Sequence, residues 1–203
     1  MTSASAEPEL PSSAQRWVIT VTVMLGALSA VLATTIINVA IPQIQGAFGM
    51  SQDDAQWLFS GTLAAVTATM MLNAWLVQSF GQRNTFVGAM TLFLAASVMG
   101  GLAPNAAILI ACRIAQGAMA GVIQPLAMYT LFRIFPPEQR GQAMGIYGIG
   151  IVLAPVFGPW VGGVLIDAFN WRYVFFMMTP ISVIGIVAGL LYMPGKEPGG
   201  RRT

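Results

Sequence analysis

The side chain best placed to do chemistry is Arg113, which lies about seven residues inside an apolar run, roughly 10 Å along a helix axis. A guanidinium in hydrocarbon costs from about 2 to over 10 kcal/mol, so it faces other helices or water. Gln116 follows three residues later and shares its helix face. The pair predicts a polar site inside a helical bundle, and snorkelling of the arginine to the nearer interface is the alternative.

A second polar group interrupts an earlier apolar run, at Thr34, Thr35 and Asn38. Thr34 and Asn38 are four residues apart, so a helix places them on one face. An asparagine in hydrocarbon needs a hydrogen-bond partner, and we expect this face to point to other helices or to a wet cavity. Two interpretations stay open, namely hydrogen bonding between helices and contact with a substrate.

The sequence lacks the residues that catalysis or metal binding needs. It contains no histidine, a single cysteine (Cys112) and no cluster of carboxylates. Because no nucleophile–base pair or metal-ligand set can be assembled, we expect neither an enzyme nor a bound metal or other cofactor. The net charge of +2 and the lack of a basic cluster argue against nucleic acid as a partner.

Membrane helices must position these side chains. Of the 203 residues, 56% are hydrophobic and 8% are charged, whereas soluble chains are roughly a quarter charged. The length allows about six helices of ~20–25 residues with short loops. We therefore expect an all-α membrane protein, a six-transmembrane-helix bundle over residues 17–193 in contact with the lipid bilayer. The expected spans are residues 17–41, 55–77, 85–102, 106–132, 141–166 and 173–193.

The ends of the first span and the two chain tails are also predicted. Residues 1–16 are rich in Ser, Ala, Glu and Pro and predict a disordered tail. Pro42 is expected to end the first helix, with an outer loop over residues 42–54. Residues 194–203 form a second polar tail, which is basic.

The positive charges predict how the bundle is oriented. One side of the predicted bundle carries seven of them, namely Arg16, Arg83, Arg133, Arg140, Lys196, Arg201 and Arg202. The other side carries Arg172 alone. Because loops rich in Lys and Arg stay in the cytoplasm, we expect a multi-pass protein of the cell membrane with both termini cytoplasmic.

A stripe of small residues marks the predicted fifth span. Gly150, Ala154, Gly158 and Gly162 recur every four residues, which puts them on one helix face and allows a second helix to pack closely. In the same stretch stand two prolines, Pro155 and Pro159. Each removes one backbone donor, so this helix is expected to bend.

Two stretches carry a specific resemblance to a known family. The order G-x-x-x-A-P-x-x-G-P-x-x-G-G at residues 150–163, which includes Gly163, resembles the fifth-helix antiporter motif of drug:proton exchangers in the major facilitator superfamily. The order L-x-x-x-R-x-x-Q-G-x-x-x-G at residues 109–121 is similar to that superfamily's fourth-helix motif. In that motif the arginine faces a central cavity and is tied to proton transfer, a role that the resemblance implies for Arg113.

Two further stretches resemble family motifs less completely. V-L-A-T-T-I-I-N-V-A-I-P is similar to the first-helix motif L-D-x-T-I-V-N-V-A-L-P of the fourteen-span drug antiporters, but Ala33 stands where that motif has an acid. Gly81 and Arg83 fit the loop motif between the second and third helices, in which Gln78 replaces another acid. The missing acids make proton coupling the least supported part of the resemblance.

The resemblance implies the amino-terminal six-helix half of a proton-coupled multidrug exporter. Such a half works against a second one, which would be missing from this chain, a separate partner or a second copy. Protons would be the coupling ion and a small molecule the substrate. The alternatives are a non-transporting membrane assembly subunit and a truncated fragment without activity of its own. Arginine stays protonated, so the proton carrier would lie in the second half or be Asp167.

Overall fold

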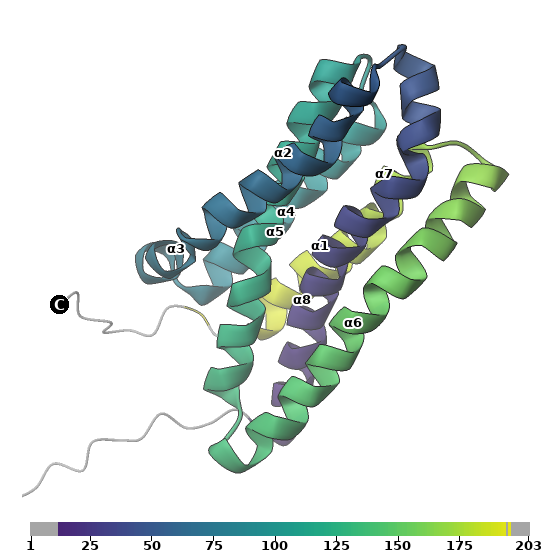
Figure 1. Cartoon of the computed structure of the whole chain (residues 1–203). Coiled ribbons are helices and arrows are strands. Elements are labelled where there is room, and N and C mark those ends of the chain that lie inside the picture. The colour runs from purple at the N-terminus through teal and green to yellow at the C-terminus, as the bar shows by residue number, and fades with distance from the viewer. Residues whose placement is uncertain (1–11, 194, 196–203) are drawn as a thin grey trace, which may run out of the picture.

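The structure is a computed structural model that describes residues 12–193 and 195, and each element in that part of the chain is an α-helix (Figure 1). Five stretches there are long and apolar enough to cross a membrane, and a bent helix pair makes a sixth. The expected six-helix bundle is therefore confirmed. The helices are α1 (Ser13–Phe48), α2 (Gln52–Met70), α3 (Asn73–Phe80), α4 (Gln82–Gly101), α5 (Ala106–Ile134), α6 (Pro137–Ala168), α7 (Arg172–Phe176) and α8 (Met178–Tyr192).

Helix α1 begins earlier than predicted. Ser12 and Gln15 form a capping box, in which the Gln15 amide donates to Ser12 Oγ at 3.3 Å and the Ser12 amide donates to Gln15 Oε1 at 3.2 Å. Residues 13–16 are therefore helical, and their assignment to a disordered tail is wrong. The remaining tail residues, 1–11 with 194 and 196–203, lie outside the described residues apart from position 195.

Helix α1 also ends later than predicted. It runs through Pro42 to Phe48 without a break, so the expected end at Pro42 is wrong. Ile44, beyond the proline, is fully buried, and this packing favours continuing the helix despite the lost backbone donor. The connection to α2 is only residues 49–51, because Ser51 caps α2, and the predicted outer loop over residues 42–54 is wrong as well.

The predicted second span is a bent pair of helices. The axes of α2 and α3 differ by 55° across their short break. Thr69 Oγ1 donates to the Ala118 carbonyl at 2.7 Å, and Asn73 Nδ2 donates to the Val122 carbonyl at 2.6 Å. These bonds attach both sides of the bend to α5, so the bend is held by the neighbouring helix.

A single residue joins α3 to α4. Gly81 has φ of 82°, a left-handed value that residues with a Cβ rarely adopt. Gly81 therefore forms the connection between the second and third predicted spans, where its motif places it. Arg83 follows in the first turn of α4 and is half-buried.

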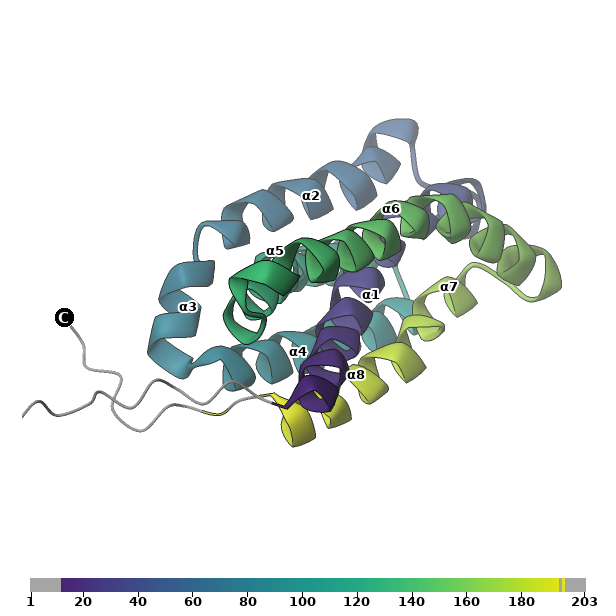
Figure 2. The ribbon, with the colours of Figure 1, turned by 90° about the horizontal axis from the view of Figure 1, so that it is seen from below.

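Helix α1 lies inside the bundle, with α5, α6 and α8 packed along it (Figures 1 and 2). Helix α4 packs on α5 and α8, and α2 packs mainly on α5. Fully buried apolar side chains fill the space between these helices, among them Val23, Ala27, Phe86, Phe93 and Ile123. This core fixes α1 and α5, the two helices that carry the predicted polar residues.

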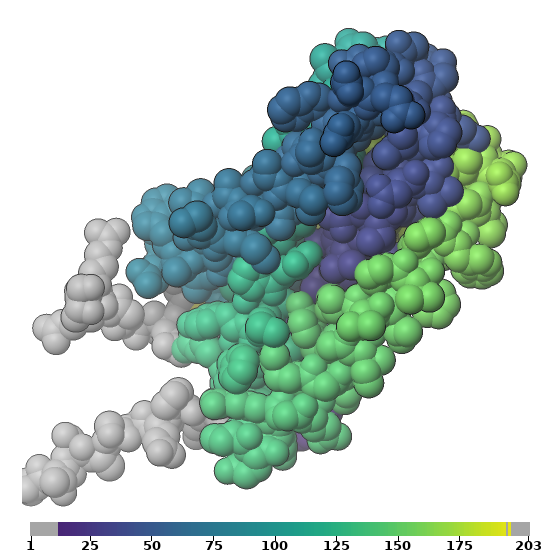
Figure 3. Space-filling view, viewed as in Figure 1, coloured from purple at the N-terminus to yellow at the C-terminus, as the bar shows by residue number. Residues whose placement is uncertain are grey.

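Helix α6 has the smallest buried fraction of the five continuous candidate spans. Figure 3 shows α1 set back between α2 and α6 on one face of the molecule. Large apolar side chains on α6 are more than half exposed, namely Ile149, Val152, Val156, Phe157, Trp160 and Val164. A continuous apolar surface of this kind needs lipid or another protein to cover it.

Arg172, the first residue of α7, binds the C-terminal end of α4. Its Nη1 donates to the carbonyls of Gly101 and Ala103 at 2.7 and 3.0 Å, where α4 ends. Its guanidinium also lies 4.5 Å from the centre of the Trp171 ring. A cation at the C-terminal end of a helix is favourable because the carbonyls there carry partial negative charge.

Replacing Arg172 with Gln should lower the melting temperature of the purified chain by about 3–6 °C, because charge-assisted bonds are worth about 1.5–3 kcal/mol. Arg83→Gln is the matched control, since Arg83 is also half-buried but makes no hydrogen bond or ion pair within the described chain. Thermal unfolding in detergent measures both variants. Equal shifts in the two variants would mean that the bonds to α4 do not stabilise the bundle.

Candidate functional site

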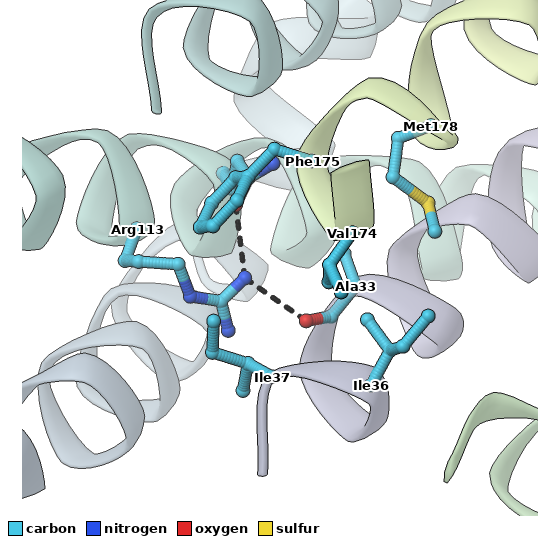
Figure 4. A pocket seen from close by; sticks show the side chains of 8 residues that line it. Ala33, Ile36, Ile37, Arg113, Val174, Phe175 and Met178 are labelled. Atoms are coloured by element: carbon cyan, nitrogen blue, oxygen red, sulfur yellow. Dashed lines mark hydrogen bonds between the residues drawn. The ribbon is translucent and has the colours of Figure 1, made fainter. Parts of the chain in front are cut away.

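Arg113 lies in the interior of the bundle, with 1% of its surface exposed. Its Nη1 donates to the carbonyl oxygen of Ala33 on α1 and to Oε1 of Gln116, each at 2.9 Å (Figure 4). The guanidinium therefore points into the bundle and does not snorkel towards an interface. The two residues that sequence placed on one helix face are in direct contact.

The hydrogen-bond chain continues from Gln116 into α4. Gln116 Nε2 donates to Ser97 Oγ at 2.7 Å, and Ser97 Oγ donates to the Phe93 carbonyl at 2.8 Å. Gln116 and Ser97 are both buried. Arg113 thus links the backbone of α1, through α5, to the backbone of α4. A movement of one of these helices would strain or break the hydrogen bonds to the other two.

Close packing of α2 against α5 supports Arg113 from behind. Thr62 Oγ1 donates to the carbonyl of Arg113 itself at 3.2 Å. A Cβ on Gly117 would strike the backbone oxygen of Thr62, and one on Gly121 would strike the backbone oxygen of Val66. The two glycines therefore allow the backbones to approach closely.

Three side chains of this contact were missed in the sequence. Thr62, Thr69 and Asn73 each donate to a carbonyl of α5. Their spacing of seven and four residues puts them on one helical face, so a signal was present. The bend between α2 and α3 let the face continue from Thr69 to Asn73.

The side chains of the predicted polar residues of the first span make no hydrogen bond to Arg113. Thr34 Oγ1 donates to the Val31 carbonyl within its own helix at 2.7 Å, and Asn38 is exposed. Thr34 and Asn38 share the side of α1 that is left partly open. Thr35 points instead towards α6. Arg113 meets this helix at the Ala33 backbone.

The stripe of small residues on α6 packs against α1. A Cβ on Gly158 would lie 2.5 Å from Thr35 Oγ1, and one on Gly162 would lie 2.5 Å from Ile36 Cγ1. Gly150 would meet Met24 Cε at 2.8 Å. The helix that packs closely against this stripe is therefore α1 of the same chain. Ala154 is buried in the same contact.

The other residues of the predicted motif on α6 lie away from α1. Pro155 and Pro159 are exposed, and a Cβ on Gly163 would meet nothing within 4 Å. Helix α6 continues through both prolines as one helix. Asp167 is exposed in its last turn.

A small cavity of about 10 Å³ lies beside the guanidinium, which is space for about one water molecule. Its lining residues, seven of them labelled in Figure 4, are Ala33, Ile36, Ile37, Arg113, Gln116, Val174, Phe175 and Met178. Sites for drug-sized ligands measure about 300–1,000 Å³, so this pocket alone holds no such molecule. Among the described residues no group of three or more His, Cys, Asp or Glu side chains could hold a metal ion.

Known proteins resemble the chain over most of its length. Among curated proteins, the MFS-type transporter YhcA of Bacillus subtilis is 37% identical over 179 residues, which is 88% of this chain and 34% of YhcA. The multidrug export protein EmrB of Haemophilus influenzae is 36% identical over 179 residues, 88% of this chain and 35% of EmrB. The chain therefore spans about a third of the length of these relatives.

The fold is also that of a solved transporter. The structure of the proton:xylose symporter XylE matches with a TM-score of 0.78 at 17% identity, over 89% of this chain and 45% of that chain. At this identity the likeness shows a shared fold. A family model described as Major Facilitator Superfamily matches residues 23–203. The chain is thus a multi-pass membrane protein that belongs to the Major Facilitator Superfamily.

Proposed function

We propose that the chain is the amino-terminal six-helix half of a proton-coupled exporter of drugs or other apolar or cationic small molecules. The observation that carries the proposal is Arg113, a buried cation that joins three helices in the interior of an apolar bundle. Ionisable groups inside membrane bundles mark transport pathways, because their burial is otherwise unfavourable. Relatives named multidrug export proteins support the direction and the substrate class.

A second six-helix half would complete the transporter. The chain spans about a third of its relatives' length, and the apolar face of α6 needs a cover. The second half can be a continuation of the chain, a separate partner or a second copy. Transporters of this architecture hold substrate between their halves, near the middle of the membrane. The open side of α1, with Thr34 and Asn38, would form one wall of that cavity.

Within this proposal the predicted residues have different roles. Arg113 and Gln116 would set the charge and the helix contacts beside the proton pathway. Arg113 stays protonated, so a carboxylate of the second half, or Asp167, would carry the proton itself. The small residues of α6 would let α1 and α6 move against each other while the cavity opens to alternate sides.

The segregation of positive charge supports a cell-membrane protein with cytoplasmic termini. In Figure 1 the start of α1 and the α5–α6 junction lie at one end of the bundle, and the α6–α7 junction lies at the other. Arg133 and Arg140 belong to the first end and Arg172 to the second. Under the positive-inside rule the first end faces the cytoplasm.

Accumulation of a cationic dye in cells tests the proposal. The chain, joined to the second half of a curated relative, should lower the steady-state dye level several-fold relative to cells with an empty vector. Collapse of the proton gradient should restore the level. A protein that inserts at normal yield and leaves dye accumulation unchanged would contradict export. The small-residue stripe packs on α1 within the chain, so it gives no separate argument for the assembly-subunit alternative.

A further inference from the structure

Helix α3 departs from the direction of the long helices. Its axis differs from that of α2 by 55°, and Figure 1 shows it end-on while α1, α5 and α6 run across the picture. Figure 2 shows the same helix from the side. The 19 residues of α2 already rise about 28 Å, close to the ~30 Å of a bilayer core. Helix α3 is therefore not needed to complete this span, and it runs crosswise to the bundle.

One side of α3 is bonded to the neighbouring helices. Asn73 is buried and donates to the Val122 carbonyl of α5 at 2.6 Å. Thr85 Oγ1, near the start of α4, donates to the Leu76 carbonyl of α3 at 3.1 Å. Leu76 and Val77 pack against the hydrophobic core. These contacts determine which side of α3 faces away from the other helices.

The other side of α3, with the bend before it, presents large apolar side chains. Met71, Leu72, Trp75 and Phe80 are between 50% and 84% exposed. The rings of Trp75 and Phe80 contact each other edge to face, with their centroids 6.0 Å apart. A helix with one apolar, aromatic side is typical of those that lie in the plane of a membrane interface. Tryptophan is enriched at that depth because its ring is apolar and its N–H group is polar.

The charges near α3 match an anionic surface. From Ala55 to Pro137 the sequence contains no Asp or Glu. Arg83 stands three residues after the end of α3, is half-buried and makes no hydrogen bond or ion pair within the described chain. Its guanidinium can therefore bind a group outside the chain, and phosphate is a common bidentate partner of arginine. Phospholipid headgroups supply phosphates next to the acyl boundary that suits Trp75.

We propose that α3 lies in the headgroup region of one membrane leaflet and binds anionic phospholipids there. Met71, Leu72, Trp75 and Phe80 would enter the acyl boundary, and Arg83 would pair with a phosphate. Because successive spans alternate in direction, this leaflet is the one at the end of the bundle where α1 begins. The binding does not depend on export, so its test is separate from the transport test.

Quenching of tryptophan fluorescence by brominated phospholipids measures the depth of Trp75 in vesicles that contain the full chain. The difference between the wild type and Trp75→Phe isolates this residue among the five tryptophans. Bromine near the headgroup end of the acyl chain should quench this difference signal about twofold more than bromine near the chain end, because an interfacial ring lies only about 5–10 Å deep. Equal or stronger quenching by the deep bromine, or quenching by neither lipid, would overturn the proposal. Quenching by neither lipid would mean that protein or water covers this side of α3.

Trp160 is the matched control. It is 68% exposed and stands eight residues before Ala168, where α6 ends, which is roughly 12 Å along the helix axis. The signal lost in Trp160→Phe should therefore be quenched more by the deep bromine.

A nitroxide on Met71→Cys, in a chain that also carries Cys112→Ala, gives a second readout if Trp75→Phe does not fold. Met71 is 84% exposed on the same apolar side. The nitroxide should collide more often with dissolved oxygen, which enters lipid, than with a water-soluble nickel chelate. The reverse order would overturn the proposal.

The preference for anionic lipid is measured in the same vesicles. Brominated phosphatidylglycerol should bind beside Trp75 about fivefold more strongly than brominated phosphatidylcholine, which is the effect of one cation near an anionic surface. Arg83→Gln should lower this ratio to about one. Arg140→Gln, at the α5–α6 junction, is the control and should leave the ratio unchanged. A wild-type ratio near one, or a ratio that Arg83→Gln does not change, would overturn the proposed phosphate contact.

Discussion

Arg113→Ala is expected to reduce export by the two-half protein by about 100-fold or more while leaving membrane insertion near the wild-type level. The variant loses two charge-assisted bonds, each worth about 1.5–3 kcal/mol, and roughly 1.4 kcal/mol corresponds to a tenfold change in rate. Folding is less affected, because removing a buried charge without a counterion also removes its desolvation cost. Initial rates of dye export, normalised to the amount of inserted protein, measure the effect.

Arg113→Lys is the informative companion variant. A lysine ammonium is a point charge with a single nitrogen. It lacks the planar guanidinium fork of arginine, in which Nη1 alone donates to both Ala33 and Gln116 and the other two nitrogens stay free. We expect it to recover less than about a tenth of the wild-type rate. Full activity of the lysine variant would show that a generic charge is sufficient. Full activity of the alanine variant would remove Arg113 from the pathway.

Gly117→Val is expected to lower the melting temperature of the purified chain by about 10 °C or to prevent recovery of folded protein. A Cβ at this position would strike the backbone oxygen of Thr62 and lie 2.8 Å from its Cγ2. The Thr62 backbone cannot move away from the new side chain unless α2 separates from α5. Overpacking of this kind lowers the free energy of unfolding by about 3 kcal/mol or more. Circular dichroism during heating, together with size-exclusion chromatography, measures both outcomes.

Gly145→Val is the matched control for this prediction. Gly145 lies in α6 and is exposed, and a Cβ at this position would meet no atom within 4 Å. Both variants introduce the same β-branched residue into a helix, so the difference between them isolates the contact with α2. If Gly117→Val melts within about 2 °C of Gly145→Val, the close contact of the two backbones is not stabilising.

The residues of the site were predictable where their side chains contact each other. Arg113 and Gln116 stand three residues apart, and helical geometry alone brings them together. The Ala33 carbonyl could not be predicted from residue types, because every residue has a backbone acceptor. The motif resemblance marks Ala33 as the place of a missing acid, and the structure puts that position against the guanidinium.

The fold was predictable from hydrophobic runs, and its departures have local causes. Pro42 predicts a helix end because it lacks a backbone donor, but burial of Ile44 keeps α1 continuous. The sequence could not identify the helix that packs on the small-residue stripe. The spacing of these residues shows that some helix can approach closely, but it does not show which helix. Asn38 is exposed, and its predicted role therefore rests on a second half that covers α1.

Proton-driven export is tested most directly in vesicles that contain the purified two-half protein and no other transporter. An acidic interior is imposed on inside-out vesicles, and uptake of a fluorescent lipophilic cation is followed over time. We predict uptake against the dye gradient that stops when the pH gradient is collapsed. Proton-driven export would be contradicted if dye uptake were no faster than in protein-free vesicles. This result counts only where the vesicles hold the pH gradient and contain folded, correctly oriented protein.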